Sequence, residues 1–450
     1  MEDASHRASS PAIGLAVESR ALSTLIPDPE NARQHPERHV RQLAKSIQAF
    51  GFNCPILIDR DNQVVAGHGR LLAARHLGWS EVPTIRLEHL TPDQVRAYRI
   101  ADNRLTDCST WDDRLLAEQL KVLAEAELDF ELEAIGFDLP EIDLRIQGLS
   151  DTEEEDEVDL PDVQGPTVSQ LGDVWCLGPH RVFCGNALEA ESYQVLLAGA
   201  AVHLVFTDPP FNVKVQGHVM GNGKLHHDEF VMASGEMSQQ EFTHFLTQAL
   251  GQMKTTLVEG ALLYVVMDWR HLTELSQAAE SNGLEQKNLC VWDKGVGGMG
   301  SFYRSQHELI FLYKTGTAAH TNNIQLGRFG RNRTNVWKYA GANSFARRQG
   351  EENLLALHPT CKPVALVADA LLDASERGQG VLDPFLGSGT TILAAEQTGR
   401  IAYGMDLDPK YVDVAVRRWQ RKTGQQAVHA VTGETFDSRI AQTEPAEEGA

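Results

Sequence analysis

The chain of 450 residues contains no long apolar run. A membrane-spanning helix needs roughly 20 consecutive apolar residues, and no stretch of the sequence approaches that length. The first ten residues, MEDASHRASS, also lack the apolar core of a secretory signal peptide. We therefore expect a soluble, cytoplasmic protein that has no membrane partner.

Cysteine is scarce as well, with six residues in the whole chain. They form no CxxC pair and no His/Cys cluster of the kind that binds zinc. The sequence thus predicts reduced, mostly buried thiols and no metal site. The six are Cys54, Cys108, Cys176, Cys184, Cys290 and Cys361.

Basic residues are outnumbered, since 40 Lys and Arg against 62 Asp and Glu give a formal charge of −22. That balance is unfavourable for binding nucleic acid, which depends on neutralising phosphates. The acidic residues are unevenly distributed, however. Residues 151–169 hold eight of them and no basic residue, whereas residues 170–425 hold 25 acidic and 23 basic residues. Local patches, and not the whole-chain charge, therefore decide whether the chain can bind phosphate.

A chain of this length is expected to form two or three domains. We predict a smaller α+β domain over 20–145, an acidic linker over 146–169, a larger α/β domain over 170–425, and an acidic, disordered tail over 426–450. The linker prediction depends on the segment SDTEEEDEVDLPDVQGP, which has dense like charge, two prolines and no aromatic residue.

Short apolar segments predict the strands of both domains. In the smaller domain they are PILI (55–58) and QVVAG (63–67), and the periodicity of HVRQLAKSIQAFG predicts a helix that ends at Gly51. In the larger domain, five runs are suited to strands buried on both faces of a parallel sheet. These runs are 202–206, 261–266, 309–313, 380–385 and 401–406.

The first motif with chemical content is VLDPFLGSGTTILAAEQTGRIAYGMDLDP, residues 381–409. A strand ends in a turn that contains Gly387 and Gly389, a helix begins near Thr390, and the next strand ends in Asp406. This order favours a nucleotide-like ligand over a purely structural loop, because glycines admit a close ligand and a strand-end acid suits ribose hydroxyls. The dinucleotide pattern GxGxxG is not met. Asp383, at the mouth of the turn, suits a ligand that carries an ammonium group.

The second motif is HLVFTDPPFN, residues 203–212. An apolar strand delivers an acid, two rigid prolines and an aromatic ring to its carboxyl end, where open α/β sheets place their active sites. Asp208 can accept a hydrogen bond from an amino group, and Phe211 offers a face on which a flat ring can stack. The prolines, Pro209 and Pro210, fix the backbone. The alternative is that DPP is only a strand-ending turn.

A third feature is the stretch 315–350, which contains no acidic residue. Its basic residues are interleaved with Trp337, Tyr339 and amide side chains, a pattern typical of a surface that binds nucleic acid. We predict that it contacts DNA, while an ordinary basic surface loop stays open as the alternative. The basic residues are Arg328, Arg331, Arg333, Lys338, Arg347 and Arg348.

Taken together, the motifs resemble a known family. DPPF followed far along the chain by DPFLGSGTT is similar to the amino-group DNA methyltransferases of the beta group, in which the amine motif precedes the cofactor motif. HPTCKPVAL (358–366) and LGDVWCLGPHRVFCGNALE (171–189) resemble further segments of that family. The likeness covers about 170–425. It implies a Rossmann-like domain that transfers a methyl group from S-adenosyl-L-methionine to double-stranded DNA at specific sites.

The resemblance also implies roles for individual residues. The catalytic motif is expected to be Asp208, Pro209, Pro210 and Phe211. Asp208 and the Pro209 carbonyl would hold the target amine, and the flipped-out base would stack on Phe211. Aspartate at position 208 favours adenine N6 as the target, with cytosine N4 as the alternative. Asp406 is expected to hold the cofactor ribose, and Lys362, after Thr360, its carboxylate. The predicted cofactor residues are Asp383, Phe385, Gly387, Gly389, Asp406, Thr360 and Lys362.

The smaller domain resembles the N-terminal domain of ParB-type proteins, over IPDPENARQHPE, the segment around QVVAGHGRLLAARHLGW, and IADNRL. Its strand-to-helix turn, Gly67, His68, Gly69 and Arg70, is expected to direct amide donors and the side chains of His68 and Arg70 toward an anion. Two roles for this domain stay open. It binds a nucleotide or a DNA phosphate at the turn, or it is an adaptor without catalysis of its own. For the whole chain, the alternative from another class is a non-catalytic partition factor. RNA or protein amines are less favoured substrates.

Overall fold

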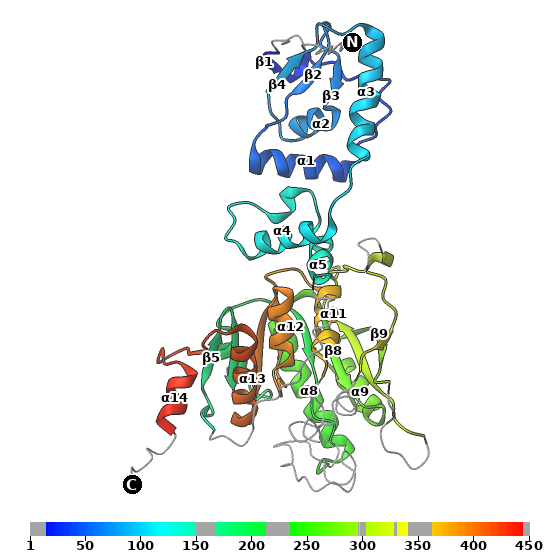
Figure 1. The fold of residues 1–450 in the computed structure, drawn as a ribbon. Coiled ribbons are helices and arrows are strands. Elements are labelled where there is room, and N and C mark those ends of the chain that lie inside the picture. Colours follow the sequence, from blue (N-terminus) through cyan, green and yellow to red (C-terminus); the bar gives the residue numbers. More distant parts are fainter. Residues whose placement is uncertain are drawn as a thin grey trace, which may run out of the picture. The chain divides into compact units, whose positions relative to one another are not determined.

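A computed structural model describes residues 15–149, 167–212, 235–295, 297, 303–327, 331–340 and 362–443 (Figure 1). The chain divides into two compact units, Met1–Leu149 and Ser150–Ala450. Residues 150–166 of the predicted linker lie outside the described residues. The two ends of that prediction belong to the folded units. Residues 146 and 147 end a helix, and the backbone N–H groups of Val168 and Ser169 donate to the buried carboxylate of Asp413.

The front unit is a small α+β fold, as predicted. Its sheet has the order β1-β4-β2-β3, in which β2 pairs in parallel with β4 and the other pairs are antiparallel. The predicted strands and helix are present, and the helix ends where Gly51 adopts φ +83°. The elements are β1 (Val17–Ala21), α1 (Glu37–Phe50), β2 (Ile56–Ile58), β3 (Val64–Ala66), α2 (His68–His76), β4 (Glu81–Arg86), α3 (Pro92–Asp107), α4 (Asp113–Glu125) and α5 (Leu139–Gln147).

The large unit is built on one sheet with the order β11-β9-β10-β8-β7-β12-β13-β6-β5-β14. Its centre, from β8 to β6, is parallel. One expectation was wrong: the run 309–313 lies in β10, which is antiparallel to both β8 and β9. The strands are β5 (Val174–Leu177), β6 (His180–Cys184), β7 (Val202–Thr207), β8 (Leu257–Met267), β9 (Glu285–Asp293), β10 (His307–Lys314), β11 (Val336–Lys338), β12 (Gly380–Asp383), β13 (Ile401–Asp406) and β14 (Val428–His429).

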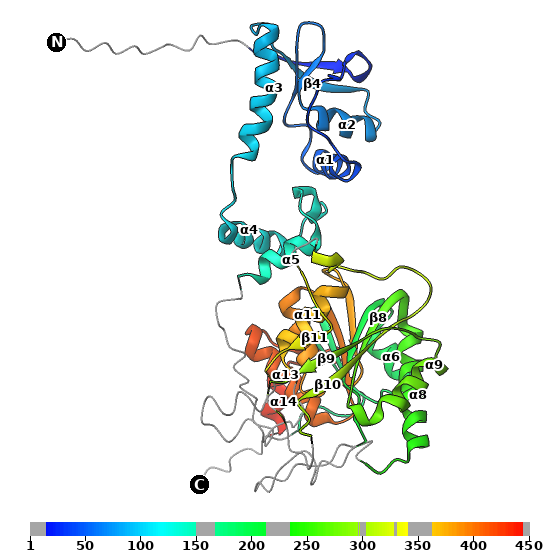
Figure 2. The same ribbon diagram turned by 90° about the vertical axis from the view of Figure 1, so that its right-hand side faces the viewer.

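Helices cover both faces of this sheet (Figure 2). Apolar side chains of α6 (Ala190–Leu197), α8 (Gln239–Thr256) and α9 (Leu272–Ser281) form one core with it. Those of α11 (Val364–Ala374), α12 (Thr390–Thr398) and α13 (Pro409–Thr423) form the other. This two-faced packing is the Rossmann-like α/β class that was expected. Within the described ranges, no helix is long and apolar enough to cross a membrane.

The predicted disordered tail is largely ordered. Residues 426–443 include β14, which pairs with β5, and α14 (Phe436–Thr443). The ring of Phe436 is fully buried and lies 5.1 Å from that of Trp175, and Arg439 forms an ion pair of 3.0 Å with Asp173. The prediction was wrong because one aromatic and one basic residue anchor a segment whose composition is otherwise polar and acidic. Residues 444–450 lie outside the described part.

Candidate active site

Three acidic residues come together because their strands are neighbours. Asp208 directly follows β7, Asp383 ends β12 and Asp406 ends β13, and β12 is hydrogen-bonded between the other two. Parallel strands present their carboxyl ends at one edge of the sheet, which is where open α/β sheets bind ligands. The sequence predicted these three carboxylates as site residues, and the sheet places all three at that edge.

The Asp383 carboxylate is buried and organises the turn that follows it. One oxygen accepts hydrogen bonds from the Thr207 hydroxyl (2.9 Å) and the Phe385 N–H (3.2 Å). The other accepts from the Thr391 hydroxyl at 2.6 Å. Burial raises the pKa of Asp383 to about 7, although these three donors act in the opposite direction. The carboxylate thus links β7, the turn and α12.

Asp406 holds the same turn from the next strand. Its carboxylate accepts one hydrogen bond from the N–H of Gly387 and one from the N–H of Asp408, and each is 2.9 Å long. Burial raises the pKa of Asp406 to about 6. Gly387 and Gly389 have φ of +51° and +83°, and a Cβ added to Gly389 would lie 2.7 Å from that of Ala415. Glycine at 389 is therefore required both by the backbone and by the contact of the turn with α13.

The two oxygens of Asp208 differ in their contacts. Oδ1 is buried and accepts no hydrogen bond from the residues that the structure describes, whereas Oδ2 lies 2.5 Å from Nζ of Lys362. Burial raises the pKa of Asp208 to about 6, with Lys362 lowering it and Glu308 raising it. A buried acceptor without a donor is costly, and such an atom in a strand-end site is suited to an incoming N–H group.

Lys362 lies in the Asp208 pocket, and its described contacts are the two carboxylates and two rings. Its Nζ is 3.2 Å from Oε2 of Glu308, and the ammonium lies 5.8 Å from the Phe211 ring centre and 5.9 Å from that of Trp292. Lys362 thus forms ion pairs with Asp208 and Glu308, and its expected contact with a cofactor carboxylate stays a prediction. Thr360 lies outside the described residues.

Three residues of this pocket escaped the sequence analysis: Trp292, Lys294 and Glu308. Lys294 forms an ion pair with Glu308, and its ammonium lies 5.0 Å from the Trp292 ring centre. Glu308 begins the apolar run ELIFLY yet is only 8% exposed. A charged residue at the start of so apolar a strand could have indicated that Glu308 belongs to a site. Charged residues are seldom buried unless they have a partner.

The amine motif continues from Asp208 into an anchored loop. Pro209 is buried, and Phe211 is partly buried and contacts both cores. Asn212 then accepts the N–H groups of Gly235 (3.0 Å) and Met237 (3.2 Å). Asn212 therefore fastens the chain on the two sides of residues 213–234, which lie outside the described part.

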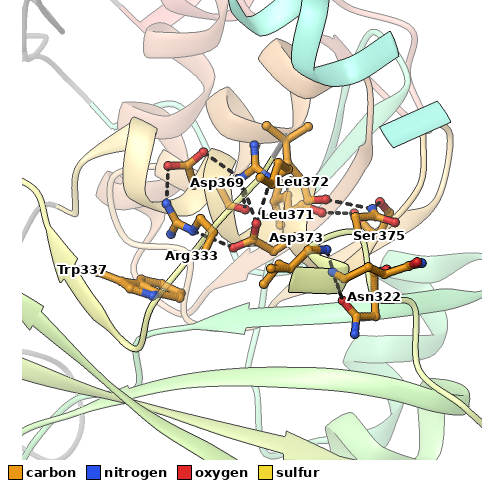
Figure 3. Close-up of polar contacts among 12 residues, drawn as sticks. Asn322, Arg333, Trp337, Asp369, Leu371, Leu372, Asp373 and Ser375 are labelled. Carbon is orange, nitrogen blue, oxygen red and sulfur yellow. Dashed lines mark hydrogen bonds and ion pairs between the residues drawn. The ribbon is translucent and has the colours of Figure 1, made fainter. Parts of the chain in front are cut away.

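Two arginines of the basic stretch are used inside the fold, and Figure 3 shows one of them, Arg333, directed toward Asp369 and Asp373. Arg333 forms ion pairs with Asp369 (2.7 Å) and Asp373 (2.9 Å) of α11. Arg331, which is 6% exposed, pairs with the same two carboxylates at 2.9 and 2.8 Å. We call these four residues the Arg–Asp clamp. The expectation that Arg331 and Arg333 contact phosphate is corrected accordingly, since the clamp neutralises their charge.

The remaining basic residues of the stretch divide into two groups. Lys338 is exposed at the end of β11, and the structure leaves its predicted DNA contact open. Arg328, Arg347 and Arg348 lie outside the described residues.

In the front unit, Gly67 precedes α2, and His68, Gly69 and Arg70 of the predicted turn form the start of that helix. Gly67 adopts φ +99°, and the His68 ring accepts the N–H of Asp28 at 3.3 Å, so the ring is turned inward. Gly69 is required by packing, because an added Cβ would lie 2.8 Å from Leu43 of α1. The guanidinium of Arg70 lies over Gly67, and its Nε is buried and has no hydrogen-bond partner in the described part of the chain.

Comparison with known proteins gives matches for both units. A family profile described as DNA methylase, of the N6/N4 type, matches residues 202–417, and one for the ParB N-terminal domain matches residues 9–103. The type II methyltransferase M.HpaI of Haemophilus parainfluenzae is 24% identical over 253 residues, covering 53% of this chain and 73% of that protein. The type II methyltransferase M.HinfI of Haemophilus influenzae is 25% identical over 257 residues, which cover 52% of this chain and 68% of that protein. The solved PvuII DNA methyltransferase (cytosine-N4-specific) is 16% identical with a TM-score of 0.40, covering 58% of this chain and 93% of its own.

Proposed function

Because residues 202–417 belong to the DNA methylases of the N6/N4 type and a ParB N-terminal domain precedes them, we propose that the protein methylates adenine N6 in double-stranded DNA. The methyl donor is S-adenosyl-L-methionine. The observation that carries the proposal is the buried, unpartnered Oδ1 of Asp208 at the carboxyl end of β7.

An aromatic amine is a weak nucleophile because its lone pair is delocalised into the ring. Asp208 Oδ1 accepts one N–H of the target amine, and the Pro209 carbonyl accepts the other. With both N–H groups held, the nitrogen can become tetrahedral and direct its lone pair at the methyl carbon. As the C–N bond forms, the C–S bond would break with its electron pair left on sulfur, and the nitrogen, which would then be positively charged, would release one proton to water.

The turn after β12 is suited to S-adenosylmethionine. The donor supplies a methyl group made electrophilic by a sulfonium. Asp406 already orients the turn backbone and retains lone pairs for ribose hydroxyls, and we assign the methionine end to Asp383, Phe385 and Gly387.

Phe211 supports base flipping. A base stacked in duplex DNA cannot reach a carboxylate at the edge of a sheet, so it must be extruded into the pocket. The partly buried Phe211 ring, three residues after Asp208, offers a stacking face beside the amine acceptors.

Sequencing of modified bases tests the substrate. Genomic DNA from an unmethylated host that expresses the protein should gain N6-methyladenine at a defined sequence, and an Asp208→Ala variant should leave it unmodified. N4-methylcytosine would favour the alternative target. No modified base would favour a non-catalytic role.

A second proposal concerns the front unit, whose turn supports binding of a nucleotide or DNA phosphate. The favouring observation is Arg70, whose buried Nε lies without a hydrogen-bond partner beside the N-terminus of α2. Titration of the full chain with nucleoside triphosphates and with duplex DNA, compared with Arg70→Ala, tests it. Unchanged affinities in the variant would leave the front unit as an adaptor.

A further inference from the structure

Four charged residues form one cluster at the amine pocket. Asp208 follows β7, Lys294 follows β9, Glu308 lies at the start of β10 and Lys362 precedes α11. Lys362 bridges Asp208 and Glu308 through Oε2 of Glu308, and Lys294 pairs with Oε1 of Glu308. Two carboxylates and two ammonium groups thus balance, as a poorly hydrated pocket requires.

The two oxygens of Asp208 have different environments. Lys362 occupies Oδ2, whereas Oδ1 has no partner. If the ammonium had Asp208 as its sole carboxylate, it would be free to move over both oxygens and compete with a substrate amine. Glu308 opposes this movement, because its Oε2 forms a second ion pair with Nζ at 3.2 Å.

Lys362 is also restricted by aromatic rings. Its ammonium lies within 6 Å of the ring centres of both Phe211 and Trp292, at a distance where cation–π attraction operates. Phe211 is the proposed stacking surface for the target base. The residue that fixes the acceptor therefore also contacts the ring that receives the base.

We infer that Glu308 is a positioning residue for methyl transfer, which acts through Lys362 to fix the Asp208 carboxylate with Oδ2 occupied and Oδ1 open to the target amine. This inference rests on the proposed function. Neither Glu308 nor Lys362 touches the transferred methyl group; they set the direction and the charge of the acceptor.

The charges of the cluster predict opposite effects on pH dependence. Asp208 must be ionised to accept the amine, and its pKa is about 6 because burial raises it, Lys362 lowers it and Glu308 raises it. Lys294 lowers it as well, and Asp383 is a further buried acid at the same edge. Removing the Glu308 charge should lower the pKa of Asp208, and removing the Lys362 charge should raise it.

The test uses the full chain and unmethylated genomic DNA at saturating S-adenosylmethionine, with kcat/KM for DNA measured against pH. The acid limb is the part of this profile in which kcat/KM falls as the pH is lowered. In Glu308→Gln this limb should move to lower pH by about one unit, and in Lys362→Gln it should move to higher pH by a similar amount. Both should lower kcat, because Asp208 is no longer held in one orientation. Lys362→Arg, which keeps the charge, should keep the wild-type limb. Glu285→Gln, on an exposed Glu–Lys pair of β9, is the matched control and should change neither quantity.

Thermal melting and cofactor affinity, measured for each variant, distinguish misfolding from a pocket effect. If Lys362→Gln fails to fold, Glu308→Gln still decides the matter, since it is isosteric. If the wild type is active and depends on Asp208, but the acid limb is the same in both variants as in the wild type, the inference about Glu308 is overturned and the proposed function is not. A wild type that transfers no methyl group to DNA overturns the proposed function with it.

Discussion

The backbone N–H of Gly387 donates a hydrogen bond of 2.9 Å to Oδ2 of Asp406, and so joins the turn after β12 to the end of β13. The carboxylate proposed to hold the ribose is thus also the group that shapes the turn proposed to hold the rest of the cofactor. Ligand affinity and local backbone geometry should therefore change together when Asp406 is replaced.

Asp406→Ala should weaken S-adenosylmethionine binding by about 1–3 kcal/mol, because a ribose contact and the anchor of Gly387 are both lost. Asp406→Asn, which keeps one acceptor oxygen, should lose less. Isothermal titration calorimetry measures both. Asp268→Ala is the control, since Asp268 follows β8 in the same sheet and accepts the N–H of Arg270. An unchanged dissociation constant in Asp406→Ala would reduce the turn to a structural one.

Asp208→Ala should lower the rate of methyl transfer by at least about a hundredfold, because the target amine is no longer aimed at the methyl group. Affinity for S-adenosylmethionine should remain close to that of the wild type, since Asp208 lies at the end of a different strand from the cofactor turn. Single-turnover transfer and calorimetry together check this. Wild-type turnover in the variant would remove Asp208 from the active site.

The protonation of Asp383 should affect stability. Burial raises its folded-state pKa to about 7, well above the roughly 3.9 of an unfolded Asp. The folded protein then binds this proton more tightly, so the contribution of Asp383 to stability is full below pH 4 and is lost as pH rises towards 7. Asp383→Asn does not titrate, and its melting temperature relative to wild type should rise between pH 5 and pH 8. A constant difference across that range would contradict the burial effect.

The Arg–Asp clamp should contribute to stability and not to DNA binding. Arg333→Ala leaves Asp369 and Asp373 short of one buried partner and should cost about 3–5 kcal/mol of unfolding free energy. Lys338→Ala, at an exposed position directly after Trp337, whose ring centre lies 5.0 Å from the Arg333 guanidinium carbon, should leave the melting temperature unchanged. If Lys338 contacts phosphate, this variant should reduce the log–log salt slope of DNA binding by about 0.9. A stable Arg333→Ala protein would show that the clamp is dispensable.

The large unit should fold and methylate DNA without the front unit. A fragment that begins at Gln164 keeps Val168 and Ser169, whose N–H groups satisfy the buried Asp413. A fragment that begins at Gln170 lacks both donors and should melt at a lower temperature, because Asp413 is then buried without them. Calorimetry and methyl transfer compare the two fragments. Equal melting temperatures would show that residues 167–169 are not part of the unit.

The sequence predicted those parts of the molecule that depend on local pattern. The apolar runs that became β7, β12 and β13 are continuous, and the acids at their ends followed from where such strands place ligands. The direction of β10 was not predictable in this way, because a short apolar run has the same composition in a parallel and an antiparallel pair.

Pairings between distant residues account for the other differences. Nothing in RFGRNRTNVW indicates that Asp369 and Asp373 face Arg331 and Arg333, so a basic stretch in an acidic chain was interpreted as a phosphate surface. Lys362 likewise reaches an aspartate 154 positions away, a partner that only the folded sheet supplies. In the first case, the local charge predicted a charged partner but could not tell a protein carboxylate from a phosphate, whereas the contact of Lys362 with a cofactor carboxylate, which the family resemblance implies, stays a prediction.

The position of β12 has a consequence for synthesis of the chain. β12 is hydrogen-bonded between β7 and β13, yet it is made long after β7 and β8. Until residues 380–406 leave the ribosome, β7 has an open, apolar edge in the middle of the future sheet, and such edges are prone to pair with other chains. The sheet of the front unit can pair much earlier during synthesis, because its described strands all precede residue 87. A chain that terminates prematurely before β12 should therefore carry a folded front unit attached to an aggregation-prone half-sheet.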